Sequence, residues 1–410
     1  MTLTRRQLDG AVVYAAICGG EELGYVAVDS TVRGRACGGL RMLHDVTADE
    51  LRALARSMTL KFGLLGLPQG GAKAGVRADP DAPPEWRLAA LCRFARQIAP
   101  LLRSRAYLPG RDMGTTSLDV RRVLRAAGVR VGRREQRPAA SGYWTALSVA
   151  AAAAAAMRRR GLDLRGRTAA IEGFGGVGAP LAGLLAEAGA KVVAVSTSHG
   201  ALYDPRGLDV DALARLAARA GSRAVELCGG RRLPDPSDLL ELPVDLLCPC
   251  ARSGSIGAGN VERVRAGVVC PGANNPLTPD AEQALARWGV LCVPDFLANC
   301  GGVLGGTMEF AAVAPPRIAA TIGRYVFAAV EALLRRAERE GVAPRGPAED
   351  AALRRHREVK QRAERPSLAG RALSAAVVLH RHGLLPPALV GAAAPAYFER
   401  RLADMVRALA

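Results

Sequence analysis

Apolar residues follow two different periods along the chain, and this alternation predicts a mixed α/β protein. Short runs rich in Val, Ile and Tyr occupy residues 11–18 and 25–30, separated by glycines and glutamates, and are typical of strands. From Thr47 to about Leu65, apolar residues recur every three or four positions, as they do on one face of a helix. Thr47 followed by Glu50 is the capping-box pattern that begins such a helix.

Further segments of the first half continue this mixture. Helices are expected at residues 83–102, 117–127 and 143–160, the last of which contains seven consecutive alanines. Because alanine is the strongest helix former, the alanine run indicates a helix and not disorder. The glycine-rich residues 70–75 are interpreted as a loop, and the polar, Arg-rich residues 130–137 as a linker.

The second half alternates short apolar strands with helical segments, the pattern of a doubly wound parallel sheet. Strands are expected at residues 168–172, 191–195, 244–250, 268–270 and 290–293. Beyond residue 309 the pattern is mostly helical. It includes a highly charged, solvated segment at residues 338–364 and amphipathic pieces at residues 368–383 and 396–409.

Composition narrows the class of protein. Half of the 410 residues are hydrophobic, so a sizeable core is possible, and 4% are aromatic, so Ala, Leu and Val must fill most of it. The net charge of +18 raises the alternative of a nucleic-acid partner. The arginines are spread along the chain, however, and no long basic run alternates with aromatics. An arginine-biased composition is the favoured interpretation, with no nucleic-acid partner.

Nine cysteines and the N-terminal segment bear on the compartment. The cysteines are odd in number, form no C-x-x-C, and include one Cys248-x-Cys250 pair without a second pair to complete a metal site. Free thiols in a reducing compartment are expected, with no bound metal. The sequence contains neither a signal-peptide pattern nor a run of about 18 apolar residues. A soluble, cytoplasmic protein without membrane contact is expected.

Two lysines draw attention to one stretch. Among 56 lysine and arginine residues only four are lysine, and two of these, Lys61 and Lys73, lie twelve residues apart. Arginine stays protonated in proteins, whereas burial can make lysine neutral, so a site that needs a titratable amine must use lysine. Both could be leftover surface charges. The small residues around Lys73, in Gly-Gly-Ala-Lys-Ala-Gly, favour a functional role because they allow close approach of a ligand.

Asp112 is the candidate acid that accompanies these lysines. It lies in Pro-Gly-Arg-Asp-Met-Gly-Thr-Thr, which reads as a loop leaving a short strand. Asp112 could simply cap the helix that starts near Ser117. A carboxylate near a buried amine can also exchange protons with it, and the two lysines favour this second role.

A glycine motif predicts nucleotide binding. Gly173-Phe-Gly-Gly-Val-Gly178 lies between an expected strand and a helix, with another strand about twenty residues on. Glycines allow a pyrophosphate to approach the backbone, and the helix N-terminus supplies unpaired N–H groups. The alternative is a tight turn without a ligand. The second strand ends in Ser196-Thr197-Ser198-His199. It lacks the usual ribose-binding carboxylate, which slightly favours NADP over NAD, with His199 or Arg206 available to a phosphate.

These stretches together resemble the glutamate/leucine/phenylalanine/valine dehydrogenase superfamily. The matching segments, in the family's order between residues 38 and 303, are GGLRM, MTLKFGLLGLPQGGAKAGV, PGRDMGTT, SGYW, IEGFGGVGAPLAGLLAEAGAKVVAVS, PGANNPLTPDA and PDFLANCGGV. The resemblance implies an enzyme that reversibly deaminates an L-amino acid to a 2-oxo acid and ammonia, with NAD or NADP as the cofactor. It also implies a homo-oligomer. The last hundred residues match only in helical character.

The resemblance also implies a domain organisation. The fold is expected to be α/β with two domains, an N-terminal substrate and oligomerisation domain at residues 1–135 and a Rossmann-like doubly wound dinucleotide-binding domain at residues 136–298. The helices of residues 299–410 are expected to return to the first domain. Catalysis is expected in the cleft between the domains, which would close by a hinge motion.

Residue roles follow from the same resemblance. Lys61 would bind the substrate α-carboxylate, Lys73 would be the amine of lowered pKa that activates water, and Asp112 would shuttle protons with the substrate amine. Ser141 would lie near the nicotinamide amide, and Gly176 replaces a common asparagine. The cofactor-binding residues are expected to be Ser141, Gly173, Phe174, Gly175, Gly176, Val177, Gly178, Thr197, Ala251, Asn274 and Asn299.

Two departures from the glutamate enzymes bear on the substrate. Those enzymes have a lysine where this chain has Cys37, just before Gly38 and the substrate-pocket residue Gly39, and a serine where this chain has Gly306. Without both partners a buried side-chain carboxylate would be unpaired, at a cost of several kcal/mol. An apolar amino acid is therefore expected, as in the leucine and phenylalanine enzymes, and Gly305 with Gly306 would enlarge the pocket wall.

The same departures support a second hypothesis, a catalytically silent relative that binds nucleotide or a partner. Cys37, Gly176, Thr197 and Gly306 motivate it, whereas intact Lys73 and Asp112 argue against it. A basic nucleic-acid-binding protein is the third and least favoured hypothesis.

Overall fold

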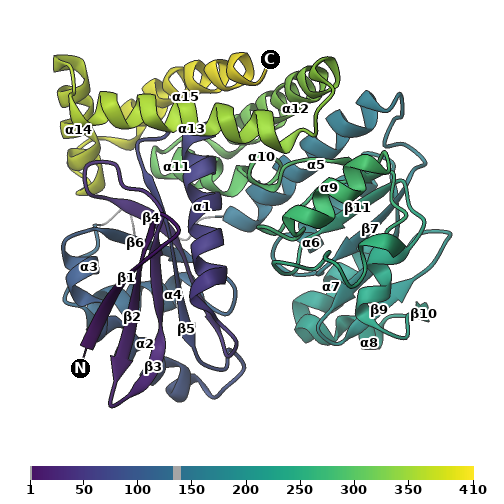
Figure 1. The fold of residues 1–410 in the computed structure, drawn as a ribbon, viewed down its shortest axis with the longest axis horizontal. Coiled ribbons are helices and arrows are strands. Elements are labelled where there is room, and N and C mark those ends of the chain that lie inside the picture. The colour runs from purple at the N-terminus through teal and green to yellow at the C-terminus, as the bar shows by residue number, and fades with distance from the viewer. Residues whose placement is uncertain (1, 133–139) are drawn as a thin grey trace. The chain divides into compact units, whose positions relative to one another are not determined.

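A computed structural model describes residues 2–132 and 140–410 (Figure 1). Its two sheets, each associated with helices, confirm the α/β class. Contacts divide the chain into two compact units, Met1–Pro138 with Ala352–Ala392, and Ala139–Ala351 with Ala393–Ala410. Most of the expected linker, residues 130–137, lies outside the described residues.

This division differs from the expected one at the C-terminal helices. The first unit takes only Ala352–Ala392 from that region, and the preceding helices group with the second unit. The reason is that two of these helices, α11 (Gly301–Phe310) and α12 (Pro315–Glu340), pack on the long alanine-rich helix α5 (Ser141–Arg159).

The first unit is built on a six-stranded sheet, drawn in purple to blue in Figure 1, with the order β1-β2-β3-β5-β4-β6. Neighbouring strands from β1 to β5 in this order are antiparallel, and β4 is parallel to both β5 and β6. The strands are β1 (Thr2–Leu8), β2 (Ala11–Cys18), β3 (Glu21–Val28), β4 (Ala36–Leu43), β5 (Gly70–Arg77) and β6 (Tyr107–Arg111).

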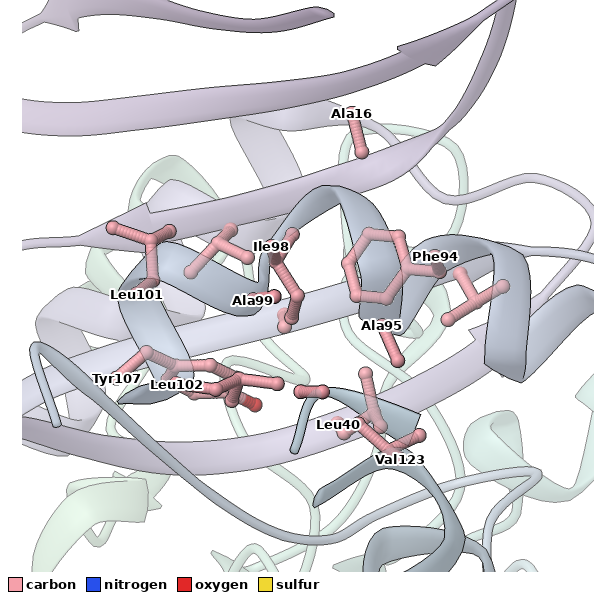
Figure 2. Close-up of a cluster of buried hydrophobic side chains, with 14 of the residues drawn as sticks. Ala16, Leu40, Phe94, Ala95, Ile98, Ala99, Leu101, Leu102, Tyr107 and Val123 are labelled. Atoms are coloured by element: carbon pink, nitrogen blue, oxygen red, sulfur yellow. The ribbon is translucent and has the colours of Figure 1, made fainter. Parts of the chain in front are cut away.

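Helices pack on the two faces of this sheet. One face contacts α1 through a small core that includes Leu51, Leu54 and Ala55. The other face packs against α2, α3 and α4 in a larger core around Phe94 and Tyr107, as Figure 2 shows. The helices are α1 (Ala48–Leu64), α2 (Pro84–Gln97), α3 (Ala99–Arg103) and α4 (Ser117–Ala126).

Two sequence-based expectations are wrong here. The single helix expected at residues 83–102 is divided near Ile98, where Pro100 opens a new helix, because proline cannot donate its backbone nitrogen to the preceding turn. The glycine-rich residues 70–75 form the inner strand β5 and not a loop. Gly38 shows why glycine suits this sheet, since a Cβ atom there would lie 1.6 Å from the carbonyl oxygen of Ala72.

The second unit is built on a seven-stranded sheet with the order β10-β9-β8-β7-β11-β12-β13. Its strands from β8 to β13 in this order are parallel, and β9 and β10 add an antiparallel edge. All five predicted strands are present, although three are shorter than expected. The strands are β7 (Thr168–Glu172), β8 (Lys191–Thr197), β9 (Gly200–Tyr203), β10 (Arg231–Arg232), β11 (Leu246–Pro249), β12 (Val268–Val269) and β13 (Leu291–Cys292).

Helices connect the parallel strands, as a doubly wound sheet requires. The α-helices are α6 (Gly178–Glu187), α7 (Val210–Ala220), α8 (Ala224–Leu227), α9 (Pro279–Arg287) and α10 (Asp295–Ala298). Short 3₁₀ turns occupy Gly221–Arg223, Pro236–Glu241 and Val261–Arg263.

The C-terminal region is helical, as predicted. The charged segment is less solvated than expected, because its helix buries Ala348, Ala352 and His356. Within the described residues, no helix combines the length and the apolar character that crossing a membrane requires. The helices are α13 (Arg345–Glu364), α14 (Leu368–Arg381) and α15 (Pro387–Leu409).

Candidate active site

Lys73 lies on the sheet face that α1 covers, between two glycines of β5. A Cβ atom at Gly71 would lie 2.3 Å from the backbone nitrogen of Thr59 in α1, and one at Gly75 would lie 2.5 Å from Cγ1 of Val46. Because side chains alternate along a strand, Lys73 shares this face with both glycines. The glycines let α1 approach closely, and Lys73 is 3% exposed.

Asp112 pairs with Lys73. It directly follows β6, and its Oδ2 atom contacts Nζ of Lys73. The backbone N–H of Met113 donates to its Oδ1 atom at 2.8 Å. The cap of α4 is Thr116, whose hydroxyl accepts from the backbone of Asp119, so Asp112 does not cap that helix. The structure thus brings together two residues that are 39 positions apart in the sequence and that the sequence analysis had selected.

Arg41 joins this pair and was missed by the sequence analysis. It lies on β4, is 4% exposed, and its Nε atom lies 3.6 Å from Oδ2 of Asp112. Its Nη1 atom donates to Oε1 of Glu50 at 2.5 Å. Thr47 caps α1 as predicted, but the Glu50 carboxylate expected to complete a capping box binds Arg41. The only signal in the sequence was that Arg41 belongs to the GGLRM segment.

Lys73 and Asp112 both have pKa values that are shifted in the folded chain. Burial lowers the pKa of Lys73, and the Arg41 charge acts in the same direction, against the raising effects of Asp112 and Glu50. Burial alone would raise the pKa of Asp112, but the positive charges of Lys73 and Arg41 outweigh it and bring this pKa to about 2. The site therefore holds an ionised carboxylate against an amine that loses its proton more readily than an ordinary lysine.

Gly39 and Cys37 lie on β4 beside this cluster. A Cβ atom at Gly39 would lie 2.7 Å from Oδ2 of Asp112, so glycine makes room for the acid. Burial raises the pKa of Cys37 to about 11, which leaves a neutral thiol at the position where the glutamate enzymes have a lysine. Lys61 is 4% exposed in the last turn of α1, where a cation complements the helix dipole.

Gly306 lies in the second unit, half-buried on α11. Its neighbour Gly305 does not enlarge a pocket wall as expected. A Cβ atom there would lie 2.3 Å from the indole Cγ of Trp144, so Gly305 is needed for the packing of α11 on α5. The indole N–H of Trp144 also donates to Glu309 at 2.8 Å.

The glycine motif forms the turn between β7 and α6. Gly173 adopts a φ of +87°, and a Cβ atom at Gly178 would lie 1.9 Å from the carbonyl oxygen of Gly173. The N–H of Phe174 donates to the carbonyl of Ser196 on β8 at 2.6 Å, which ties the turn to the neighbouring strand. A Cβ atom added at Gly175 or at the following Gly176 would meet nothing within 4 Å beyond its immediate chain neighbours. The turn is thus closed on the sheet side, whereas the Cβ positions of Gly175 and Gly176 face open space.

The other predicted cofactor residues surround the ends of these strands. Ala251 contacts the Cβ position of Gly173, and Thr197 ends β8 with its hydroxyl donating to the carbonyl of Ser222 at 2.7 Å. Ser141 begins α5. Val177 is the N-cap of α6.

Asn299 supplies an acceptor without a partner. Its amide donates to the carbonyls of Ala273 at 2.7 Å and Gly272 at 3.3 Å, and lies 3.4 Å from Oδ1 of Asn274. Its own Oδ1 atom is buried and has no hydrogen-bond partner among the described residues. Such an atom suits a ligand donor such as a carboxamide. Glu172, the last residue of β7, has a pKa raised by burial, and no motif in the sequence pointed to it.

No cluster of three or more His, Cys, Asp or Glu side chains suited to a metal occurs within residues 2–132 and 140–410. The nine cysteines are all free, and four of them are buried.

Comparison with known proteins places this geometry in a family. Residues 22–127 match the dimerisation domain of the Glu/Leu/Phe/Val dehydrogenases, and residues 135–362 match the Glutamate/Leucine/Phenylalanine/Valine dehydrogenase family. The chain is similar to the glutamate dehydrogenase of Thermotoga maritima, with 40% identity over 304 residues that cover 70% of this chain and 72% of the relative. It is 35% identical over 302 residues, again 70% and 72% of the two chains, to the NADP(+)-dependent glutamate dehydrogenase of Pyrobaculum calidifontis.

A solved structure agrees with this assignment. The hetero-hexameric glutamate dehydrogenase from Thermus thermophilus superposes with a TM-score of 0.70 and 29% identity, covering 86% of this chain and 89% of that one. The two family matches and these relatives cover both units. The chain therefore belongs to the glutamate/leucine/phenylalanine/valine dehydrogenase family.

Proposed function

We propose that this chain is an NAD(P)-dependent dehydrogenase that oxidatively deaminates an apolar L-amino acid to the 2-oxo acid and ammonia, as a homo-oligomer. The observation that carries the proposal is the ion pair between Lys73, which is buried, and Asp112, which is half-buried beside Gly39. Membership of the dehydrogenase family supports the reaction class. The match to the family's dimerisation domain and a hetero-hexameric relative support an oligomer.

The side chains of the first unit divide the proton chemistry. Lys61, whose side chain is buried, binds the substrate α-carboxylate through its ammonium group. Lys73 takes a proton from the water that attacks the imino carbon, a role that its lowered pKa favours. Asp112 exchanges protons with the substrate nitrogen. It takes a proton as the substrate ammonium becomes a neutral amine, and it returns a proton later, as ammonia leaves. The two groups titrate as a pair, because loss of the Lys73 proton removes a positive charge that keeps Asp112 acidic.

The second unit supplies residues that fit a dinucleotide. The open turn at Gly175 and Gly176, followed by the N-terminus of α6, presents backbone N–H groups suited to a pyrophosphate. The unpartnered Oδ1 atom of Asn299 would accept a hydrogen bond from the nicotinamide carboxamide, and Ser141 would contact the same group. A bound nicotinamide would supply the acceptor for the hydride that leaves the substrate α-carbon.

The end of β8 favours NADP. Thr197 occupies the strand end beside the glycine turn, and the neighbouring Ser196 and Ser198 bring no negative charge. A ribose 2′-phosphate would therefore meet no repulsion there.

The neutral Cys37 and Gly306 favour an apolar substrate. A glutamate side-chain carboxylate needs a cation or several donors when it is buried. Neither residue supplies a charge, and the pKa of Cys37 is raised to about 11. The relatives named glutamate dehydrogenase make glutamate the competing substrate.

One assay tests these assignments. The purified protein is given L-glutamate and a panel of apolar L-amino acids, each with NAD and with NADP, and the appearance of reduced cofactor is followed. We expect kcat/KM for an apolar amino acid to exceed that for glutamate by at least about tenfold. A preference for glutamate contradicts the substrate proposal, and cofactor binding without any turnover favours a catalytically silent relative. Lys73→Met is the control, with expected loss of turnover and retained cofactor binding.

A further inference from the structure

We propose that Arg41, held in place by Glu50, is a positioning residue that places a fixed positive charge beside Asp112 and Lys73 and so sets the charge around the pair. This inference rests on the proposed function for its catalytic meaning, but its structural core can be tested without turnover. The two residues come from different elements, β4 and the first turn of α1.

The contacts form one continuous chain of charges. Glu50 accepts a hydrogen bond from Nη1 of Arg41 at 2.5 Å, Nε of Arg41 lies 3.6 Å from Oδ2 of Asp112, and the same oxygen contacts Nζ of Lys73. Opposite charges thus alternate from the helix to the catalytic amine. Because guanidinium is planar and rigid, binding Glu50 with one nitrogen fixes the direction of the others toward Asp112.

Burial distinguishes this row of four charged side chains from a surface ion pair. The side chains of Arg41 and Lys73 are 5% and 4% exposed, and those of Asp112 and Glu50 are 17% and 27% exposed. Charges so far removed from water are weakly screened, so the charges of Arg41 and Glu50 both act on the pKa of Lys73. The other titratable groups at this place, Cys37 and Tyr107, have pKa values raised by burial and stay neutral near pH 7. Lys61, on α1, is a further buried lysine of the same unit.

The two partners act on Lys73 in opposite directions. The positive charge of Arg41 disfavours the protonated amine, and the negative charge of Glu50 favours it. Removing Arg41 should therefore raise the pKa of Lys73, and removing the charge of Glu50 should lower it. A role that is merely structural predicts loss of stability or activity from both changes, but not shifts of opposite sign.

Lysine NMR measures these shifts directly. The chain has only four lysines, at positions 61, 73, 191 and 360, so ¹³C labels on the lysine side chains give few signals, and Lys→Arg variants assign them. We expect Arg41→Met to raise the pKa of Lys73 and Glu50→Gln to lower it, because the two charges act on the amine with opposite signs. The double variant should fall between the two. Arg52→Met, on the same helix but paired with Asp9 and Asp49, is the matched control and should leave the pKa unchanged.

The same variants are then followed by activity. The acidic limb of the pH profile of kcat/KM should move to higher pH in Arg41→Met and to lower pH in Glu50→Gln. Arg41→Lys keeps the positive charge but lacks the planar guanidinium donors. The acidic limb of its kcat/KM profile should therefore return toward that of the unmodified enzyme, while kcat stays reduced. Glu50→Gln keeps the hydrogen bond from the backbone N–H of residue 50 to the Thr47 hydroxyl. This variant therefore still tests the proposal if Arg41→Met does not fold.

Two results would overturn the proposal. Shifts of the same sign in Arg41→Met and Glu50→Gln contradict it, and so do unchanged Lys73 titrations combined with reduced kcat. An enzyme that turns over no amino acid but shows the opposite NMR shifts retains this inference and loses the proposed function.

Discussion

Single side chains explain much of the first site, and glycine is as important there as lysine. Gly39 lies so close to Asp112 that even one methyl group must displace the acid. On the neighbouring strand β6, Gly110 has nothing closer than the carbonyl oxygen of Gly38 at 4.0 Å from its Cβ position. Replacing either glycine by alanine therefore adds the same methyl group, with a clash at Gly39 and without one at Gly110.

We expect Gly39→Ala to reduce kcat/KM by roughly 100-fold, because a displacement of about 1 Å in a catalytic group has that effect. Gly110→Ala is the control and should stay close to the unmodified enzyme. Steady-state kinetics, with circular dichroism to check the fold, decide between the outcomes. Equal activity of the two variants would mean that the position of Asp112 is not critical.

Cys37 and Gly306 carry the substrate prediction. Replacing both, as Cys37→Lys with Gly306→Ser, returns a cation and a hydroxyl to positions where the glutamate enzymes have them. The ratio of kcat/KM for glutamate over an apolar amino acid should rise by at least about tenfold. Cys92→Lys, which adds the same charge on α2, should not change this ratio. An unchanged ratio in the double variant would show that specificity is set elsewhere.

Helices and strands position the second site through buried polar connections. Arg345 at the start of α13 donates to Oδ1 of Asp295 at 2.7 Å and to Oε2 of Glu282 at 2.5 Å. Asp295 is fully buried, and its other oxygen accepts the backbone N–H of Asn275 at 3.0 Å. One arginine therefore connects α13 and α9 with the loop that carries Asn274.

Arg345→Met should destabilise the protein by roughly 3–5 kcal/mol, because it leaves a buried carboxylate without its cation. The surface pair of Arg335 and Glu331 provides the comparison, and Arg335→Met should change stability by less than about 1 kcal/mol. Urea unfolding monitored by fluorescence measures both. Similar losses in the two variants would contradict this account of the network.

The end of β8 carries the cofactor prediction. Thr197→Asp places a carboxylate where many dinucleotide enzymes bind the ribose hydroxyls. KM for NADP should rise by at least about tenfold while KM for NAD falls, since a 2′-phosphate is repelled by the new charge. Ser198→Ala is the control and should preserve the ratio. A ratio that is unchanged by Thr197→Asp would remove the reason for favouring NADP.

For the chain as a whole, the depressed pKa of Asp112 links the active site to acid stability. A carboxyl group with a lower pKa in the folded state stabilises the protein above its unfolded-state pKa, and this contribution disappears as the pH falls toward the folded-state value. The pKa falls from 3.8 to about 2 in the folded chain, so the window is approximately pH 4 to pH 2.

We expect about 2 kcal/mol of unfolding free energy to be lost across this window because of Asp112. Asp112→Asn should lack this part of the pH dependence, although other carboxyl groups still titrate. Denaturant unfolding of both proteins at several pH values isolates the difference. Parallel pH curves would show that Asp112 has an ordinary pKa in the folded protein.

Much of the fold and of the site could be predicted from local patterns. The alanine-rich helix, the parallel strands and the glycine turn all appear where their periodicity and composition indicate. The failures have a common cause. The glycines of β5 resemble a loop in sequence because their packing partners, such as Thr59 on α1, are not visible in a local pattern. Glu50 is a similar case. Its place in a capping pattern gave no indication that its carboxylate binds Arg41, which lies on another element.

Local chemistry along the chain was sufficient to select Lys61, Lys73 and Asp112 and to indicate a dinucleotide turn, because residue type and neighbouring glycines are properties of short segments. The pairing of Lys73 with Asp112 and Arg41 required the folded chain, since the strand order β5-β4-β6 brings together residues far apart in sequence. Burial, which lowers the pKa of Lys73, likewise arises only when α1 covers the sheet.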